Sequence, residues 1–297
     1  LCDRRQRQMC IRDRTVITSV SMGLLLYNRY ETAMRQNDVR DAQNLMETIA
    51  DSMEQYLKNM RQISDTVNYN IIQAHDVSSP EFNQQLSLLY DLNKDKIQSI
   101  ALYDMDGELL GAEPVTIQKE GIEVSRQSWF ENAKEKIENM HFSTPHMQDL
   151  FQDDAKRYHW VISLSRAVEV IDGDSPENGI LLVDMKYSFI EEMMDQINDS
   201  SRGRYYYLCD REGKLIYHPY ANEISNGLFQ ENSGLASCSE DGIYRNLRSP
   251  HGEKQTMIVN TISYTGWKLV GVVLPDIRTD SLEKFRIYMI TIMIMLI

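Results

Sequence analysis

The feature that most constrains the fold is a long stretch with neither proline nor glycine, from Asn28 to Ala74. Its apolar positions recur at heptad spacing in two seams. One seam is Ala42, Ile49, Tyr56 and Ile63, and the other is Met46, Met53, Met60 and Val67. This narrow stripe predicts a long helix packed on a partner, and at 1.5 Å per residue it extends roughly 65–70 Å. A helix packed on its own domain is the alternative for its distal part. The run Ser78-Ser79-Pro80 ends the helix.

Both ends of the chain are apolar. Thr15 to Tyr27 reads TVITSVSMGLLLY, and Phe285 to Ile297 reads FRIYMITIMIMLI. Each is shorter than the roughly 20 residues that cross a bilayer. We nevertheless expect a transmembrane helix at 15–27 and a second, truncated one within 277–297. The alternative for the first is the apolar core of a signal peptide.

Residues 1–14, LCDRRQRQMCIRDR, resemble translated sequencing-adapter read-through and are expected to be non-native. If they are native, Arg12 and Arg14 mark a cytoplasmic leader by the positive-inside rule.

The composition of the chain is that of a folded, acidic protein. Apolar residues make up 42% and charged residues 25%, as in ordinary globular proteins. A chain of 297 residues is long enough for more than one core. Because the formal net charge is -13, binding of nucleic acid is disfavoured.

The cysteines do not form a recognisable metal or redox motif. No CxxC pair or zinc-finger spacing surrounds Cys2, Cys10, Cys209 or Cys238. We expect Cys209 and Cys238 to be two free thiols, with a disulfide between them as the alternative. No metal and no cofactor is expected.

Two strand-rich segments follow the long helix, and both have the same order. In each, a strand, an Asp-containing turn with glycine and a returning strand come first, followed by helix and further strands. The strands are expected at 97–103, 108–112, 158–170 and 179–185, and then at 204–209, 214–218, 242–247, 255–263 and 267–274. Helices are expected at 80–93, 127–138 and 187–197. Two antiparallel sheets flanked by helices make an α+β fold.

The turns Asp104 to Gly107 (DMDG) and Asp210 to Gly213 (DREG) resemble fragments of a calcium loop. Since neither run supplies the middle ligands of an EF-hand, we interpret both as hairpin turns. The polar run from Asp172 to Asn178 is expected to be a solvated loop.

No catalytic motif is present: GxSxG, HExxH, the P-loop and GxGxxG are all missing from the sequence. Three segments instead combine aromatic and polar residues. They are Trp129-Phe130, His141 to His146 and Tyr158 to Arg166. This combination suits a small-molecule pocket, where rings supply contact area and a few polar groups fix orientation. An aromatic core with satisfied polar ends is the alternative.

At these residues the sequence resembles a double Cache ectodomain, closest to that of Firmicute sensor histidine kinases of the YesM-like class. The segments that carry the resemblance are WFENA (129–133), HFSTPHMQDLF (141–151), WVISLSRAVEV (160–170), GILLVDM (179–185), YYYLCDREGKLIYHP (205–219) and TGWKLVGVV (265–273). The resemblance implies two PAS-like modules carried on one long helix between two transmembrane helices.

Cache domains that bind amino acids resemble one another in an Arg-x-Trp-Tyr run, a later tyrosine and an aspartate. Trp129 and Asp184 match this signature, Phe130 replaces the first tyrosine, and His146 replaces the later one. Gln127 stands where the arginine would bind a ligand carboxylate, and Arg126 would replace it if the register shifts by one. A sugar or a partner lipoprotein therefore competes with an amino acid or an organic acid as ligand.

The sequence thus predicts a signalling helix at 28–77, a membrane-distal PAS-like module at 78–198 and a membrane-proximal module at 199–276. We expect residues 28–280 to lie outside the cytoplasm of a cell-membrane receptor, which dimerises with a second copy through the heptad seam. The expected function is ligand sensing for a two-component histidine kinase whose kinase domain is missing here. The alternatives are a chemotaxis receptor or diguanylate cyclase, and a membrane-anchored extracellular hydrolase.

The ligand is expected in the membrane-distal module. The candidate binding residues are Trp129, Phe130, His146, Trp160, Ser163 and Asp184, with Tyr103 and Arg126 beside them.

Overall fold

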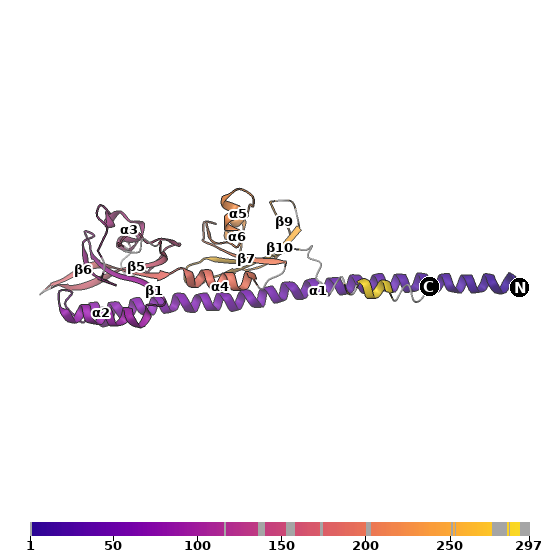
Figure 1. Cartoon of the computed structure of the whole chain (residues 1–297), viewed down its shortest axis with the longest axis horizontal. Coiled ribbons are helices and arrows are strands. Elements are labelled where there is room, and N and C mark those ends of the chain that lie inside the picture. Colours follow the sequence, from indigo (N-terminus) through magenta and orange to yellow (C-terminus); the bar gives the residue numbers. More distant parts are fainter. Residues whose placement is uncertain are drawn as a thin grey trace.

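A single long helix organises the computed structural model. The structure describes residues 2–115, 117–135, 140–152, 158–172, 175–199, 203–250, 252, 254–274, 284 and 286–291. Helix α1 (Cys2–Thr66) runs along the molecule and ends in a π-helical turn, η1 (Val67–Ile72) (Figure 1). Helix α2 (Pro80–Asn93) begins at Ser79, whose side chain accepts a hydrogen bond from the Phe82 N–H, with proline in the favoured first position.

Two antiparallel sheets lie along one side of α1 (Figure 1). The first has the order β2-β1-β6-β5-β3, with β4 also paired to β5. Its strands are β1 (Ile97–Asp104), β2 (Leu109–Glu113), β3 (His141–Phe142), β4 (His146–Met147), β5 (Trp160–Asp172) and β6 (Ser175–Lys186). The turn η2 (Val124–Arg126) and helix α3 (Ser128–Glu135) lie over its outward face, away from α1. We call this unit the first module.

The second sheet has the order β8-β7-β11-β10-β9. Its strands are β7 (Arg204–Cys209), β8 (Leu215–Tyr217), β9 (Gly242–Arg248), β10 (Lys254–Thr261) and β11 (Lys268–Val273). The short helices α5 (Ala221–Ser225) and α6 (Ser233–Ser237) lie on its outward side (Figure 1). We call this unit the second module; α4 (Ser188–Asp199) connects the two sheets along α1.

The two modules repeat one design down to the hairpin turn. In the first, the Asp104 N–H donates to the Glu108 carbonyl, and the Asp104 carboxylate accepts from the N–H groups of Asp106 and Glu108. In the second, Asp210 forms the same three bonds with Lys214 and Glu212. Both predicted turns are therefore hairpin turns whose aspartate satisfies backbone donors.

The apolar stripe of α1 is covered by both sheets of its own chain. All eight predicted seam residues are buried, none more than 8% exposed, and they share one core with the inward faces of the sheets. The predicted use of this seam to join a second copy is therefore wrong. The heptad pattern arose because β10 and β11 and then β5 and β6 pack along one face of the helix in succession.

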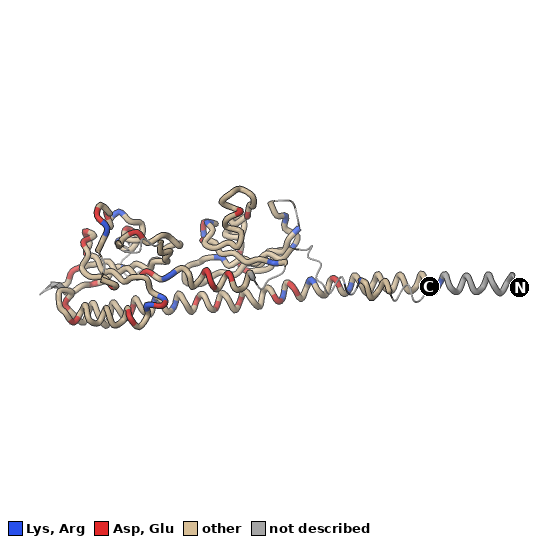
Figure 2. Tube along the Cα trace, in the orientation of Figure 1, with Lys and Arg blue, Asp and Glu red and all other residues tan. Residues whose placement is uncertain are grey.

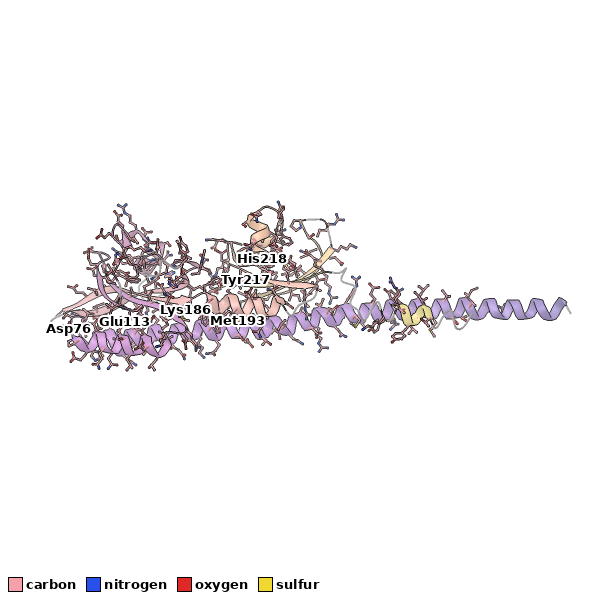
Figure 3. The ribbon with its side chains drawn as sticks, in the orientation of Figure 1. Asp76, Glu113, Lys186, Met193, Tyr217 and His218 are labelled. Carbon is pink, nitrogen blue, oxygen red and sulfur yellow. The ribbon has the colours of Figure 1, made fainter. Side chains whose placement is uncertain are left out.

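Polar contacts fix the sheets on α1. The Arg166 Nη1 of β5 lies 2.6 Å from Asp65 Oδ1 of α1, and the Arg166 side chain is only 8% exposed. The Tyr56 hydroxyl of α1 donates to the Lys186 carbonyl at the junction between the modules (Figure 3). Because a buried charge without its partner is costly, the pair Arg166–Asp65 sets the position of β5 on the helix.

The apolar ends of the chain meet. Residues 286–291 are helical and lie beside α1, where Met289 packs on Gly23. The adjoining part of α1 carries no charged side chain between Thr15 and Asn28 (Figure 2). In the described part of the chain, no helix reaches the combination of length and apolarity that spans a bilayer. Most of the stretch predicted at 277–297 lies outside the described residues.

The predicted α+β fold, long helix and antiparallel sheets are confirmed. Three local predictions differ from the structure. The expected loop at 172–178 is shorter, because β5 and β6 pair out to Asp172 and Ser175. The short strands β3 and β4 were not predicted, and the long helix changes to a π-helical turn at Val67.

The closeness of β1 and β6 yields a stability test. A Cβ atom added at Gly179 would lie 2.7 Å from the Tyr103 carbonyl oxygen and 2.8 Å from Val170 Cγ2. We expect Gly179→Ala to lower the free energy of unfolding by about 1–3 kcal/mol, because backbone cannot rotate away. Gly234→Ala is the control, since nothing lies within 4 Å of its added methyl group. Urea unfolding measures both; equal effects would contradict the strand spacing.

Candidate ligand site in the first module

A row of polar side chains crosses the outward face of the first sheet. Ser99 of β1 pairs with Asp184 of β6, which pairs with Ser163 of β5. Successive side chains of a strand alternate between faces, so these three point to the same side, away from α1. The Ser99 hydroxyl donates to Asp184 Oδ2 at 2.8 Å and the Ser163 hydroxyl to Asp184 Oδ1 at 2.5 Å. All three residues are buried.

His146 of β4 extends this row. Its Nδ1 lies 3.0 Å from the Thr144 carbonyl oxygen and 3.2 Å from the Ser143 hydroxyl. Its Nε2 lies 3.3 Å from the Ser163 hydroxyl. The Ser163 hydroxyl, which donates to Asp184, therefore lies between the carboxyl group and the imidazole.

Burial favours the protonated form of Asp184. Removal from water raises the pKa of this carboxyl group, against the lowering effect of hydrogen bonds from Ser163 and Ser99 and of the nearby His146. The Gln148 amide reaches the row as well, 3.4 Å from Ser99 Oγ. The row therefore holds a buried carboxyl group whose hydrogen-bonding neighbours among the described residues are neutral hydroxyls, a neutral amide and one imidazole.

Aromatic rings cover the same face farther along β1. The Tyr103 and Trp129 rings lie 5.7 Å apart between centroids, and Trp129 is 7% exposed. The Ser165 hydroxyl donates to the Trp129 carbonyl at 2.8 Å, which fixes α3 on β5. The Tyr103 hydroxyl is buried and has no hydrogen-bond partner in the described part of the chain. A buried unsatisfied hydroxyl is costly, and it points to a group that a ligand would pair.

The structure brings five of the eight predicted residues to this face. Contacts join His146, Ser163 and Asp184 in one group, and Tyr103 and Trp129 in a second group on the same face. Phe130 is fully buried and packs edge-on against Trp129, as part of the core under the rings.

The other two predicted residues lie elsewhere. The Arg126 side chain is 79% exposed and its Nε lies 2.6 Å from Glu123 Oε2. Trp160 is 55% exposed, and alternation along β5 places it on the opposite face from Ser163.

Sequence reasoning did not predict Ser99 and Gln148. Small polar residues inside an apolar strand such as IQSIALYD were the available signal, because a buried serine needs a partner. No group of three or more His, Cys, Asp or Glu side chains suited to a metal ion occurs within the described ranges.

The sequence profile of the Cache domain family (dCache_1) matches residues 30–279, which is most of the chain. The chain belongs to the Cache domain family. Cache domains are extracytoplasmic ligand-binding domains of membrane receptors, so the predicted class of sensor domain is confirmed at this level.

Solved ligand-binding domains of bacterial chemoreceptors share the fold at low sequence identity. The ligand-binding domain of the Pseudomonas aeruginosa PAO1 chemoreceptor PctB with L-Arg has a TM-score of 0.59 and 17% identity, covering 83% of this chain and 91% of that one. The ligand-binding domain of the Campylobacter jejuni chemoreceptor Tlp3 with L-valine has a TM-score of 0.59 and 12% sequence identity. The match covers 83% of this chain and 96% of that one.

A third similar structure is the extracellular domain of rpHK1S-Z16, assigned to the histidine kinases, with a TM-score of 0.56 and 20% identity, covering 82% and 96%. A comparison with curated protein sequences finds no match.

The Tyr103 hydroxyl, which finds no partner in the part of the chain that the structure describes, yields a test with a matched control. Tyr103→Phe removes a buried hydroxyl that contributes no hydrogen bond in the absence of ligand. We therefore expect the free energy of unfolding to stay level or rise by about 1 kcal/mol. Tyr187→Phe should lower it by about 1 kcal/mol, because that hydroxyl donates to the Ile216 carbonyl at 2.8 Å. Denaturant unfolding without ligand measures both. A clear loss in Tyr103→Phe would mean that its hydroxyl already has a partner.

The raised pKa of Asp184 yields a pH test. The folded chain holds this proton more tightly than the unfolded chain, so stability falls as the pH rises from the ordinary value of 3.8 through the raised pKa. Asp184→Asn cannot lose a proton. We therefore expect the wild-type free energy of unfolding, relative to this variant, to decrease across that window in urea titrations. A difference that stays constant or increases with pH would refute the assignment.

Proposed function

We propose that this chain is the extracytoplasmic sensory region of a membrane receptor whose ligand binds on the outward face of the first module. The observation that carries the proposal is that the Tyr103 hydroxyl, which has no partner among the described residues, lies on the same face as the buried Asp184 row and within reach of its charge. Buried polar groups of this kind in a folded protein call for a partner, and the rings of Tyr103 and Trp129 supply a stacking surface.

The ligand class follows from the charges at this face. Asp184 suits a ligand that offers a hydroxyl or an amine, and the Tyr103 hydroxyl can donate to or accept from it. Arg126 is engaged by Glu123 at the surface, and Arg166 faces α1. Because neither guanidinium faces the site, we propose a neutral sugar or an amine in preference to a free amino acid or an organic acid. The PctB and Tlp3 domains named above, in contrast, hold L-Arg and L-valine.

Strand alternation connects the site to α1. Ser163 and Ser165 of β5 face the ligand side, while Leu164 and Arg166 between and beyond them face α1. A ligand that shifts β5 would move the Arg166–Asp65 pair and hence the end of the long helix. Small helix displacements of this kind are a known means of transmembrane signalling.

We further propose that the apolar segments at 15–27 and 277–297 anchor the chain in the membrane. The packing of Met289 on Gly23 supports this, because it brings the two segments side by side at one end of the molecule. The predicted domain division at 78–198 and 199–276 is retained. A homodimer remains part of the proposal, but it must use a surface other than the buried seam. The exposed Leu88 and Leu92 of α2 are available for it.

For the output we propose a histidine kinase of the YesM-like class. The motifs quoted from the sequence and the likeness to rpHK1S-Z16 support it. A chemotaxis receptor is the second candidate, supported by the fold shared with PctB and Tlp3. The gene sequence after the codon for Ile297 tests this choice: a phospho-acceptor histidine with an ATP-binding region favours the kinase, and a long methyl-accepting coiled coil contradicts it.

A thermal-shift screen of the purified chain tests the sensory proposal. Sugars, amines, amino acids and organic acids are added singly. A ligand at about 100 times its Kd should stabilise the fold by about 2.7 kcal/mol through mass action. Trp129→Ala is expected to abolish this shift, because the ring forms one wall of the site.

Arg126→Ala is the matched control and should keep the full shift, since its side chain is exposed. If Trp129→Ala retains the stabilisation, the ligand does not bind at this face. If only carboxylate ligands stabilise the chain and Arg126→Ala removes the effect, the proposed ligand class is wrong.

A further inference from the structure

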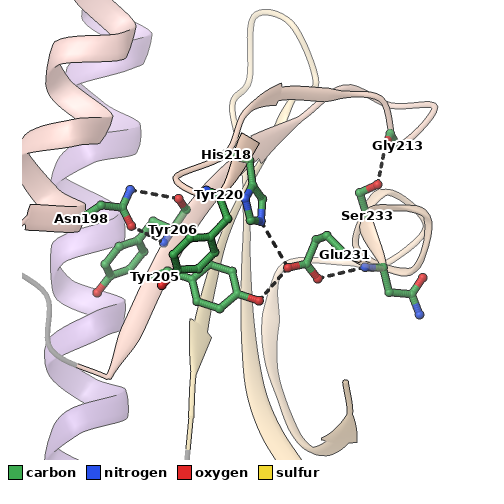
Figure 4. Close-up of polar contacts among 9 residues, drawn as sticks. Asn198, Tyr205, Tyr206, Gly213, His218, Tyr220, Glu231 and Ser233 are labelled. Atoms are coloured by element: carbon green, nitrogen blue, oxygen red, sulfur yellow. Dashed lines mark hydrogen bonds and ion pairs between the residues drawn. The ribbon is translucent and has the colours of Figure 1, made fainter. Parts of the chain in front are cut away.

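The second module carries a cluster of aromatic rings on its own outward face. Tyr205 and Tyr207 of β7 lie with His218, Tyr220 and Phe229, and neighbouring ring centroids are 5.2–6.4 Å apart. Figure 4 shows the rings of Tyr205, His218 and Tyr220 gathered beside one carboxylate, that of Glu231. We call these five rings and Glu231 the aromatic cluster.

The Glu231 carboxylate is buried among neutral donors. Its side chain is 4% exposed. Oε2 accepts from the Tyr205 hydroxyl at 2.6 Å and lies 3.4 Å from His218 Nε2, and Oε1 accepts from the Asn232 N–H at 2.9 Å (Figure 4).

The protonation of His218 follows from its other nitrogen. His218 Nδ1 accepts from the Tyr220 N–H at 3.0 Å, so the ring proton is on Nε2 and the imidazole is neutral. The contacts of Glu231 in the described residues thus bring no positive charge to it. Burial of a carboxylate is costly unless a cation compensates it.

Tyr207 supplies an independent observation. Its side chain is fully buried within the cluster, and its hydroxyl has no hydrogen-bond partner among the residues that the structure describes. Burial and the charge of Glu231 raise the pKa of Tyr207. An unsatisfied polar atom beside an uncompensated carboxylate indicates that both await the same partner.

The position of the cluster within the repeat agrees with this. Strand β7 occupies the place in the second sheet that β1 occupies in the first, next to the returning strand of the hairpin. Tyr205 and Tyr207 lie on the outward face, as Ser99 and Tyr103 do in the first module. Within one chain, the same face of the same strand therefore carries unsatisfied or uncompensated polar groups twice.

We propose that the aromatic cluster is a second ligand site, which takes a small organic cation such as an alkylammonium or quaternary ammonium ion. Ring faces attract such cations, and Glu231 supplies the opposite charge. Tyr220 is 39% exposed and lies between the buried members of the cluster and solvent, so a ligand enters past this ring. This site is separate from the one proposed in the first module and does not depend on it.

Isothermal titration of the purified 297-residue chain with tetramethylammonium chloride and methylammonium chloride tests the proposal. Sodium chloride controls for ionic strength, and tert-butanol is a neutral probe of similar shape. We expect at least one ammonium probe to bind saturably and both controls not to bind. Glu231→Gln keeps an acceptor but removes the charge, and should weaken binding roughly tenfold or more.

Tyr220→Ala provides a second variant that changes a partly exposed ring and should weaken binding by several-fold. Arg126→Ala changes an exposed residue of the other module that lies outside both proposed sites, and should leave ammonium binding unchanged. The proposal is overturned if neither ammonium probe binds, if tert-butanol binds equally well, or if Glu231→Gln and Tyr220→Ala both bind as the wild type does. Loss of binding in Asp184→Asn alone would place the cation in the first module and also overturn it.

Discussion

The packing of one apolar stripe of α1 against two sheets is the contact on which the rest of this structure depends. Most of the stability of a helix in a folded protein comes from the apolar face that it buries, and not from its own hydrogen bonds. Met46 and Met53 lie in the same core as Tyr206 and Leu269 of the second sheet, and farther along the helix Ile63 shares that core with Leu181 of the first. The modules are therefore positioned relative to each other through the helix.

This arrangement gives each sheet two chemically different faces. The inward face meets α1 and is mainly apolar, with Arg166 of the first sheet paired with Asp65, whereas the outward face is free to carry polar groups. In the first sheet that freedom is used for Ser99, Asp184 and Ser163, and in the second for the tyrosines around Glu231. In this fold a polar site on the outward face of a sheet and α1 on its inward face are separated by only one strand.

Sequence patterns predicted most of the fold because its determinants are local. Proline at position 80 starts α2, the turns from Asp104 to Gly107 and from Asp210 to Gly213 fix both hairpins, and alternation identifies the main strands. The two-residue strands β3 and β4 have too few residues to show any period. The sequence correctly predicted that the heptad seam is buried, but it did not predict which surface covers it. An apolar stripe indicates burial and does not identify the covering surface.

The candidate site could be predicted only in part, for a related reason. Asp184 and Trp129 stand in recognisable segments, whereas Ser99 gains its meaning from pairing with a strand 85 residues away in sequence. Alternation along β5 could have placed Trp160 on the opposite face from Ser163, since their positions differ by an odd number. The outward turn of Arg126 depends on its ion pair with Glu123.

Thiol labelling of single-cysteine variants tests most directly whether α1 is covered by its own chain. With the native cysteines replaced, Met53→Cys probes the buried stripe, where the methionine is 1% exposed, and Ser52→Cys probes the exposed face beside it. The account predicts that Cys at position 53 reacts slower by on the order of 100-fold or more, at every protein concentration, because only opening of the fold exposes it. Equal rates at both positions would contradict it and show that the stripe is uncovered. Protection that disappears on dilution would also contradict it, and would show that a second copy covers the stripe.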